Sequence, residues 1–587
     1  MGFYTAKANL FCNEQLFEMV LNHFNPKTRE GRQTLLSVLM VETNWFDRAA
    51  HVLWREATSK ALSYLLPRYT PRQVLEPRRW ADALSPEDYA RLKVYAPHIA
   101  NLVHDDKIHN AQDALMFEAF ILGSSFPIGK DDEKPIFTRL THLEWKRTEL
   151  STHHDETNPL RNCVRPGERF LEFVGRISTG RLRTLLLDVP VLVEPCVDGW
   201  VQFFQGLRDL KCLTFPLPLT ACTMAVLNGL SKLKCLERLS TITSRCQTDD
   251  FGNFGFTPEF QEGAFPRLKG LHLACYPRDV SQLLGARYAP KELVELTILL
   301  PFTRDLHNAT SRDINSLFRS IASHCKRLKK LSCYYDRHDG RFPSVRRHDI
   351  IHAESFRPLY ALRNMISFRF ACTLEVRFAQ EDIEALASSW PSLKHLQLES
   401  EELFSVITDK TLNLDALLPL ARHCPNLEDL KISLSCQNGP LLKNADHPLP
   451  TFQKLKALHL FPGFTSLPAP QDLVLTLFRM YPSPGRWTFT YPWDHSGYSA
   501  YYKSLDRIRQ IELVLLRERI QRGWKTATCV VDALSRYQRD LHRIPEEKQG
   551  IRMRAQKTRD EAPIGPCRVW SFGETFTNAL GFFFGRA

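Results

Sequence analysis

The chain has 587 residues, of which 43% are hydrophobic and 24% are charged, and its formal net charge at pH 7 is +12. These proportions are ordinary for a folded protein, and the length exceeds the ~250–300 residues of a single core unless the chain is built from repeats. The fifteen cysteines never form a C-x-x-C pair, which excludes common zinc knuckles, a RING domain and a thioredoxin-like motif. Their odd number and scattered spacing predict reduced thiols rather than a disulfide framework.

Several further classes of protein are disfavoured by what the chain lacks. Its first residues, MGFYTAKANL, have no basic stretch followed by an apolar one, and no window reaches the ~18 uncharged apolar residues of a membrane helix. We therefore expect a soluble protein of the cytoplasm, the nucleus or both. No phosphate-binding, zincin or nucleophile-elbow motif occurs. We therefore predict that the chain has no catalytic residue, binds no metal or cofactor and is not an enzyme.

Residues 11–54 predict three short helices. The stretch FCNEQLFEMVLNHF (11–24) places apolar residues along one helical face, and NPKTREGRQ (25–33) interrupts it. TLLSVLMVETNWFDRAAHVLW (34–54) then supplies two more apolar helical stretches. Because a bundle of about 45 residues buries too little apolar surface to be stable by itself, we expect its apolar faces to dock another protein.

A helical linker is predicted after this bundle, over 67–135. Within it, LSPEDYARLKVYAPHIANLV (84–103) offers Ser85 as an N-cap and Pro86 in the first helical turn. Both residue types are preferred at these positions, so the stretch predicts a helix.

Beyond residue 135 one pattern, L-x-x-L-x-L or a close relative, recurs in eleven copies spaced about 32 residues apart. The copies are LTHLEW (140–145), LRTLLL (182–187), LKCLTF (210–215), LERLST (236–241), LKGLHL (268–273), LVELTI (293–298), LKKLSC (328–333), MISFRF (365–370), LKHLQL (393–398), LEDLKI (427–432) and LKALHL (455–460). Alternating apolar residues predict a short strand with one buried face. GRWTFTY (485–491) is interpreted as a degenerate closing strand.

Helical runs precede many of these copies. In SRDINSLFRSIASHCKRL (311–328), Ile314, Leu317 and Ile321 lie along one face. Lateral stacking of helix–strand units buries a continuous core that one unit cannot bury alone. The pattern therefore predicts a leucine-rich-repeat solenoid of curved helix–strand repeats over 136–492.

Two copies contain a His-Cys pair, in SHCKRLKKL and ARHCPNLEDL. Such a pair can belong to a metal site or a cysteine nucleophile. Each pair here closes a helix at the same phase of the repeat, so we interpret both cysteines as core residues.

Three features together resemble one family. The pattern L-P-x-E-x-L followed by W-F-x-x-A-x-x-x-L-W is typical of the F-box, and residues 9–66 are similar to its divergent form in fungal F-box-like proteins. The matching positions here are Phe11, Cys12, Asn13, Glu14, Gln15, Leu16, Trp45, Phe46, Ala49, Leu53 and Trp54. YAPHIANL (95–102) resembles the element that joins the F-box to the repeats, and the H-C-P-N-L-x-x-L form resembles cysteine-containing leucine-rich repeats. Cys12 and Phe11 depart from the family's proline and leucine.

The resemblance implies a function in ubiquitin transfer. A fungal F-box-like leucine-rich-repeat protein would be the substrate-recognition subunit of an SCF-type cullin–RING ligase, with the F-box binding a Skp-family adaptor and the repeats binding an unknown protein substrate. Adaptor contact is expected from Phe11, Cys12, Glu14, Leu16, Val20 and Leu39. Substrate contact is expected from strand positions between the buried leucines, namely Glu144, Trp145, His272, Lys330, Ser332, Tyr334, His395, Gln397 and Lys431.

Two alternatives stay open. A degenerate F-box, suggested by Cys12, would leave a leucine-rich-repeat interaction scaffold that acts without the ligase. The basic region over 493–560 contains 15 Lys or Arg against 7 Asp or Glu between Lys503 and Arg559. Its lack of interleaved aromatic residues favours a solvated helical region over nucleic-acid binding. Residues 561–587 are predicted to be a tail, for which disorder is one interpretation.

Overall fold

The computed structural model describes residues 14–63, 86–105, 137–146, 181–188, 197–216, 223–242, 259–300, 310–335, 350–372, 375–400, 412–434, 450–462, 480 and 486–489. All of them belong to the first of two compact units, Met1–Ile520, and the second unit is Gln521–Ala587. The predicted basic region (493–560) and the tail (561–587) lie outside the described residues, as do Phe11 and Cys12.

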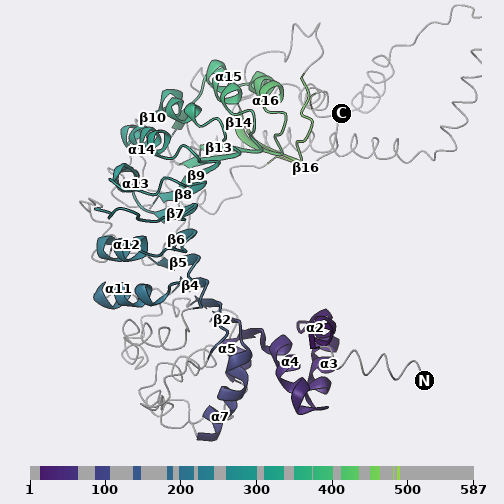
Figure 1. Ribbon diagram of the computed structural model, residues 1–587. Coiled ribbons are helices and arrows are strands. Elements are labelled where there is room, and N and C mark those ends of the chain that lie inside the picture. The colour runs from purple at the N-terminus through teal and green to yellow at the C-terminus, as the bar shows by residue number, and fades with distance from the viewer. Residues whose placement is uncertain are drawn as a thin grey trace, which may run out of the picture. The chain divides into compact units, whose positions relative to one another are not determined.

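The described part of the chain is an α/β structure with one large parallel sheet (Figure 1). Fourteen strands lie side by side in the order in which they occur in the sequence, and each pairs in parallel with its neighbours. The strands are β1 (Glu56–Thr58), β2 (Asn101–Asp105), β3 (His142–Lys146), β4 (Thr184–Asp188), β5 (Cys212–Pro216), β6 (Arg238–Ile242), β7 (Gly270–Ala274), β8 (Glu295–Leu300), β9 (Lys330–Tyr335), β11 (Ser367–Cys372), β13 (His395–Ser400), β14 (Asp429–Leu434), β15 (Ala457–Pro462) and β16 (Arg486–Phe489). This order is consistent with a solenoid-like stack of repeats.

A second, two-stranded sheet pairs β10 (Ile350–His352) with β12 (Glu375–Arg377). Every one of the eleven predicted L-x-x-L-x-L copies supplies a strand of the large sheet, and the predicted closing strand coincides with β16. Leucines of successive copies stand in register and are buried, for example Leu143 beside Leu185 and Leu185 beside Leu213.

The sheet begins earlier in the chain than the predicted repeat region. β1 falls within the predicted F-box-like helical module (9–66), and β2 falls within the predicted helical linker (67–135). β1 is only three residues long, and its single buried residue is Ala57. The segment of β2 has Ile99 and Leu102 at the first two leucine positions and the buried His104 at the third. Backbone hydrogen bonding nonetheless continues through them, since Asn101 N donates to Arg55 O at 2.8 Å and His142 N donates to Ala100 O at 3.0 Å.

The helices cover one face of the sheet (Figure 1). In the part described they are α5 (Ser59–Ser63), α7 (Pro86–Tyr95), η2 (Ala96–His98), α11 (Val197–Gly206), α12 (Thr223–Ser231), α13 (Pro277–Gly285), α14 (Ser311–His324), η4 (Ala353–Ser355), η5 (Arg357–Ala361), α15 (Gln380–Ser389), η6 (Leu414–Ala416) and α16 (Leu417–His423). α11 packs against α12, α13 against α14, and α15 against α16.

Helix α14 has the apolar face that its sequence predicts. Thr310 caps its start, because the Thr310 hydroxyl accepts from Asp313 N and the Asp313 carboxylate accepts from Thr310 N. Ile314, Leu317 and Ile321 are fully buried against the sheet side. The predicted helical face is therefore confirmed.

In the least regular repeat copy, MISFRF, aromatic rings form the core beside the strand. Phe356 lies 5.2 Å from Phe318, 5.1 Å from Phe370 and 5.0 Å from Phe378, measured between ring centroids. All these residues are buried, as is Phe368 beside them. Edge-on and tilted rings replace the leucine layers at this point of the stack.

Three helices precede the sheet: α2 (Glu14–His23), α3 (Arg29–Leu39) and α4 (Thr43–Trp54). Their shared core consists of Phe17, Leu21, Leu35, Ala49 and Val52. The bundle is compatible with the predicted three-helix module, and its assignment as an F-box stays a prediction.

The two tryptophans of α4 have different surroundings. Trp45 packs against the core of the bundle, 5.0 Å from the ring of Phe17. Trp54 instead contacts Tyr95, at the end of α7, with 5.1 Å between ring centroids. Phe46 also contacts Tyr95, at 6.0 Å. One tryptophan thus stabilises the bundle and the other packs on the segment that leads into β2.

Candidate functional site

The helical module exposes apolar side chains that its core leaves out. Six large hydrophobic residues are exposed in the described part of the chain, and five of them lie in this module. They are Leu16 and Met19 on α2, with Leu36, Met40 and Val41 at the end of α3. We call these five residues the apolar surface. Exposed large apolar residues are thus concentrated in this module, on two of its helices, and such concentrations are typical of protein-binding sites.

The local sequence explains why these residues cannot enter the core. Adjacent residues on a helix point in different directions, so Leu35 is fully buried while Leu36 is 50% exposed. Leu39 packs partly against the core, and Met40, the C-cap of α3, is 87% exposed. Leu36 and Met40 are one helical turn apart and share one face of α3. The last turn of α3 therefore presents an apolar side to solvent.

The predicted adaptor-contact residues have different surroundings. Leu16 is exposed, Val20 is half-buried, and Leu39 packs against the bundle core. Glu14 begins α2, and Phe11 and Cys12 lie outside the described residues.

Sequence reasoning missed Met19, Leu36, Met40 and Val41. The signal that identifies Leu36 and Met40 is the adjacent apolar pairs of α3, Leu35-Leu36 and Leu39-Met40. When a helix packs against a core on one side only, one residue of each adjacent pair faces the core and the other faces away from it.

The second candidate surface is the face of the sheet opposite the helices. Five predicted substrate-contact residues occupy one row of the strand register, in which each residue pairs with a residue of the next strand. They are Glu144, His272, Ser332, Gln397 and Lys431. Lys330 and His395 lie in a parallel row two residues earlier, and Tyr334 lies in a row two residues later.

Trp145 is the exception among the predicted substrate-contact residues. Its side chain is 2% exposed and stacks on the His104 ring, with 4.3 Å between centroids. Trp145 follows Glu144 directly, so it points to the opposite face of the sheet. The expectation that Trp145 faces solvent was wrong, because the strand alternation is one residue out of phase with it.

Several residues of this solvent-facing row are already engaged with their neighbours. Glu144 forms ion pairs with Lys146 and with His142, the latter at 3.6 Å. The Ser240 hydroxyl lies 3.1 Å from His272 Nδ1. Burial lowers the pKa of His272, and Glu295 opposes this effect. The row is polar and partly paired, a surface that suits recognition of a polar partner.

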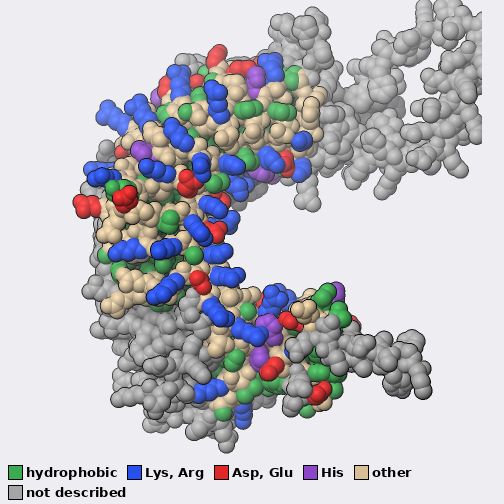
Figure 2. Space-filling view, in the orientation of Figure 1, with side chains coloured by type: hydrophobic (Ala, Val, Ile, Leu, Met, Phe, Trp, Pro, Cys, Tyr) green, Lys and Arg blue, Asp and Glu red, His purple; other side chains and the backbone are tan. Residues whose placement is uncertain are grey.

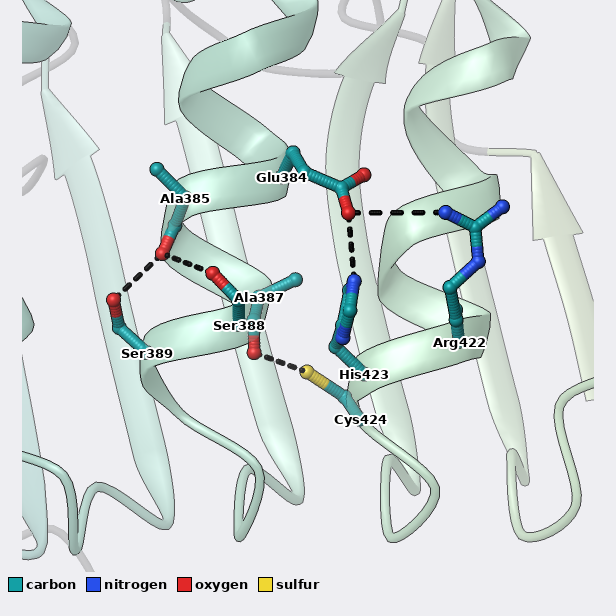
Figure 3. Close-up of polar contacts among 8 residues, drawn as sticks. All are labelled: Glu384, Ala385, Ala387, Ser388, Ser389, Arg422, His423 and Cys424. Atoms are coloured by element: carbon teal, nitrogen blue, oxygen red, sulfur yellow. Dashed lines mark hydrogen bonds and ion pairs between the residues drawn. The ribbon is translucent and has the colours of Figure 1, made fainter.

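The His-Cys pairs do not form a catalytic or metal-binding arrangement. His423 turns outward, where its Nε2 lies 2.6 Å from Glu384 Oε1 on the neighbouring helix (Figure 3). Cys424 turns inward, and its thiol contacts the backbone carbonyl of Ala387 at 3.6 Å (Figure 3). Burial raises the pKa of Cys424 to about 12. A thiol with this pKa is almost never a thiolate at neutral pH.

Cys325 closes α14 in the same way and is fully buried. Burial raises its pKa to about 12 as well. The interpretation of both cysteines as core residues is therefore confirmed.

We expect Cys325 and Cys424 to resist alkylation in the folded protein. With a pKa of about 12, their thiolate fraction at pH 8 is about 10⁻⁴, and burial blocks access to the reagent as well. Iodoacetamide labelling followed by peptide mass spectrometry checks this. Labelling in urea serves as the control, since both thiols should then react. Rapid labelling of either cysteine in the native protein would contradict the buried placement.

The junction between α4 and β2 predicts a loss of stability in acid. Burial lowers the pKa of both His51 and His98; Asp47 raises the pKa of His98, and Arg139 lowers both. The unfolded chain therefore binds protons, near the ordinary histidine pKa of about 6.5, before the folded one does. The stability that depends on neutral histidines is present above about pH 6.5 and is lost as the pH falls below it.

Amide exchange in α4 tests this expectation between about pH 7.5 and about pH 5.5, a range that spans histidine titration. After correction for intrinsic exchange rates, protection should decrease towards acid in the wild type and less so in a His51→Gln, His98→Gln variant. An equal decrease in both proteins would assign the acid sensitivity to other groups.

Two structural findings bear on other functions. None of the helices described is long and apolar enough to cross a bilayer. Among the residues that the structure describes, no group of three or more His, Cys, Asp or Glu side chains is placed to hold a metal ion.

Comparison with known proteins gives little that is specific. No protein family matches the sequence, and no curated protein matches it. Among solved structures, the chain is similar to the crystal structure of the Rad7 and Elc1 complex in yeast, with a TM-score of 0.31 and 12% sequence identity, over 82% of this chain and 90% of that chain. A TM-score this low carries no argument about fold or function.

Proposed function

We propose that the protein is the substrate-recognition subunit of an SCF-type cullin–RING ubiquitin ligase. In this proposal α2, α3 and α4 dock a Skp-family adaptor, and the solvent-facing side of the sheet binds the substrate. The observation that carries the proposal is the apolar surface, because it lies on the module whose sequence resembles the F-box. The polar sheet face supplies a second, separate surface, as a protein that links two partners requires.

The size of the exposed side chains fits a protein-docking role. Burying a Leu, Met or Val side chain that is otherwise exposed contributes about 1.5–3 kcal/mol. Met40 and Val41 are 87% and 63% exposed, so a partner can remove most of their area from water. A few such residues supply most of the binding free energy in a typical interface.

The receptor's contribution to ubiquitin transfer is proximity. A substrate held on the sheet is brought to the ligase through the adaptor, which raises the effective concentration of a target lysine near the conjugating enzyme. This role needs no catalytic residue in the chain itself.

Single substitutions in the apolar surface test the proposal. We expect Leu36→Glu and Met40→Glu each to weaken binding to a Skp-family adaptor by at least about tenfold, because each places a charge in an apolar interface. Both side chains are exposed in the free protein, so the variants should fold. Co-expression and co-purification, followed by calorimetric titration, measure the effect.

Val94→Glu is the matched control, since Val94, on α7, is an exposed large hydrophobic residue in the described part of the chain that lies outside the module. It should leave adaptor binding within about twofold of the wild type, as expected for a surface substitution away from an interface. If the wild type does not bind the adaptor, the ligase assignment fails and an interaction scaffold with a degenerate F-box is left. Equal weakening by all three variants would show that the apolar surface is not the docking site.

A further inference from the structure

A second charged feature lies at the edge of the sheet where the strands begin. Six successive strands, β4 to β9, are each entered by a turn with an exposed Lys or Arg (Figure 2). One such residue from each turn defines what we call the basic row: Arg183, Arg208, Lys234, Lys269, Lys291 and Lys329. None of the six forms an ion pair with a described residue.

The repeat geometry aligns these turns. Lys269 N donates to Glu237 O at 2.9 Å, Val294 N donates to Lys269 O, and Lys329 N donates to Val294 O, both at 2.8 Å. Equivalent positions of successive turns thus follow one another at the ~4.8 Å spacing of neighbouring strands. Arg183, Lys269 and Lys329 occupy this aligned position, whereas Arg208, Lys234 and Lys291 stand three residues earlier in their turns, before Lys211, Glu237 and Val294. The cations therefore form a band across the entries of the strands.

Two acidic residues of the same turns pair with cations outside the basic row. Glu237 lies 3.7 Å from Lys211, and Glu292 pairs with Arg327. Asp209, beside Arg208, is exposed and forms no ion pair with a described residue, so basic residues outnumber unpaired acidic ones in these turns. The chain's net charge of +12 is in part concentrated here.

In the later repeats some of these cations are paired. Glu428, at the entry to β14, accepts from the equivalent residues of both neighbouring turns, with Lys394 at 3.3 Å and Lys456 at 2.5 Å. Arg363, in the turn that enters β11, is exposed and forms no ion pair with a described residue.

An extended polyanion fits a band of cations, and the surroundings distinguish its chemistry. Proteins that bind single-stranded nucleic acid place aromatic side chains under the bases, but among the solvent-facing positions of β4 to β9 that the structure describes only Tyr334, on β9, is aromatic. The backbone of a nucleic-acid duplex winds away from a straight line. An extended peptide has neither constraint, and its alternate side chains point the same way at ~6.8 Å intervals.

We propose that the basic row holds an extended segment of the substrate that is rich in Asp and Glu. That the acidic segment belongs to a ligase substrate rests on the function proposed above, whereas the binding of an acidic segment does not depend on that function. Flexible Lys and Arg side chains adapt to a range of carboxylate spacings, so the row selects for charge and extension more than for a fixed sequence.

The test uses the full chain and a fluorescein-labelled peptide of alternating Glu and Ser, about ten residues long, which is about 33 Å when extended. A peptide of alternating Gln and Ser and an oligothymidylate of equal charge are the comparison ligands. We expect the Glu peptide to bind, the Gln peptide not to bind, and the affinity for the Glu peptide to fall steeply between about 50 mM and about 200 mM salt.

Two triple variants, which remove the same charge from the same repeats, locate the site. Lys269→Gln, Lys291→Gln, Lys329→Gln should raise the Kd of the Glu peptide by at least about tenfold. Arg278→Gln, Arg312→Gln, Arg319→Gln changes exposed residues of α13 and α14 on the helix side, and should change the Kd by less than about threefold, the part due to net charge alone.

Three outcomes would overturn the proposal: no binding of the Glu peptide, equal weakening by both triple variants, or tighter binding of the oligothymidylate than of the Glu peptide. The last outcome would assign the row to nucleic acid. Adaptor binding measured on the same proteins should be unchanged in both triple variants. A failure of the basic row is thereby distinguished from a failure of the ligase function.

Discussion

Replacing Trp390 with alanine is expected to lower the free energy of unfolding of the repeats around β11 and β13 by about 3–5 kcal/mol. Trp390 is the largest of the fully buried side chains in the described part of the chain. Its ring lies 5.1 Å from that of Phe368 and 6.0 Å from that of Tyr360, and its Nε1 donates to Leu359 O at 3.3 Å. The substitution leaves a large cavity and removes that donor from a buried carbonyl.

The substitution should destabilise the repeats around Trp390 more than distant repeats, because a repeat array is stabilised by contacts between neighbouring repeats. Amide exchange in α15, β11 and β13 should accelerate more than exchange in β4 and β5. Trp390→Phe retains most of the packing and should cost less than half as much. Arg369→Ala, at an exposed position of β11, is the control and should stay within about 0.5 kcal/mol of the wild type. Equal exchange in Trp390→Ala and the wild type would contradict the buried position of the ring.

The sheet was predictable because its signal is repeated many times. Each L-x-x-L-x-L copy specifies both a strand and the face it buries, so an error in one copy does not change the register of the others. The copy MISFRF has no leucine, yet its place in the series identified β11. Of the two missed strands, β1 has no leucine, and β2 has a histidine, His104, where the third leucine of a copy would stand. Ala57 is a residue that no apolar pattern marks as core.

Side-chain exposure on the strands was less predictable than the strands themselves. Trp145 was assigned to the solvent-facing side although Leu143, two residues before it, is buried. The strict two-residue period of a strand places both on one face, so Trp145 belongs with the buried residues. The row that contains Ser332, Gln397 and Lys431 follows from the same period.

The apolar surface of the helical module could not be found by counting apolar residues. Leu35 and Leu36 are the same residue type, but Leu35 is buried and Leu36 is exposed. Which of the two faces inward depends on how α3 packs on α4. The basic row was missed for a related reason. Its cations are about 20–40 residues apart in the sequence and form no local run of charge. Only the repeat geometry brings their turns side by side.

Replacing Gly31 with alanine is expected to disrupt the helical module and with it adaptor binding. A Cβ at Gly31 would lie 2.1 Å from Asn25 O, 2.8 Å from Asn25 C and 2.9 Å from Thr28 Oγ1. The first two atoms are backbone and cannot rotate away. Asn25 O accepts a hydrogen bond from Thr28 N, and Gly31 N donates to Thr28 Oγ1 at the cap of α3. Relief of the clash must therefore open the turn and the helix cap together.

The cost combines overpacking, about 1–3 kcal/mol or more, with loss of the cap, about 1 kcal/mol. For a bundle of three short helices, that sum is comparable to the whole stability. Amide exchange should thus show the loss of protection in α2 and α3 while β7 to β9 keep theirs, and adaptor affinity should fall with it. Gly206→Ala is the matched control, since nothing lies within 4 Å of a Cβ there. If Gly31→Ala retained both protection and adaptor affinity, α3 would not have to hold its capped geometry for docking.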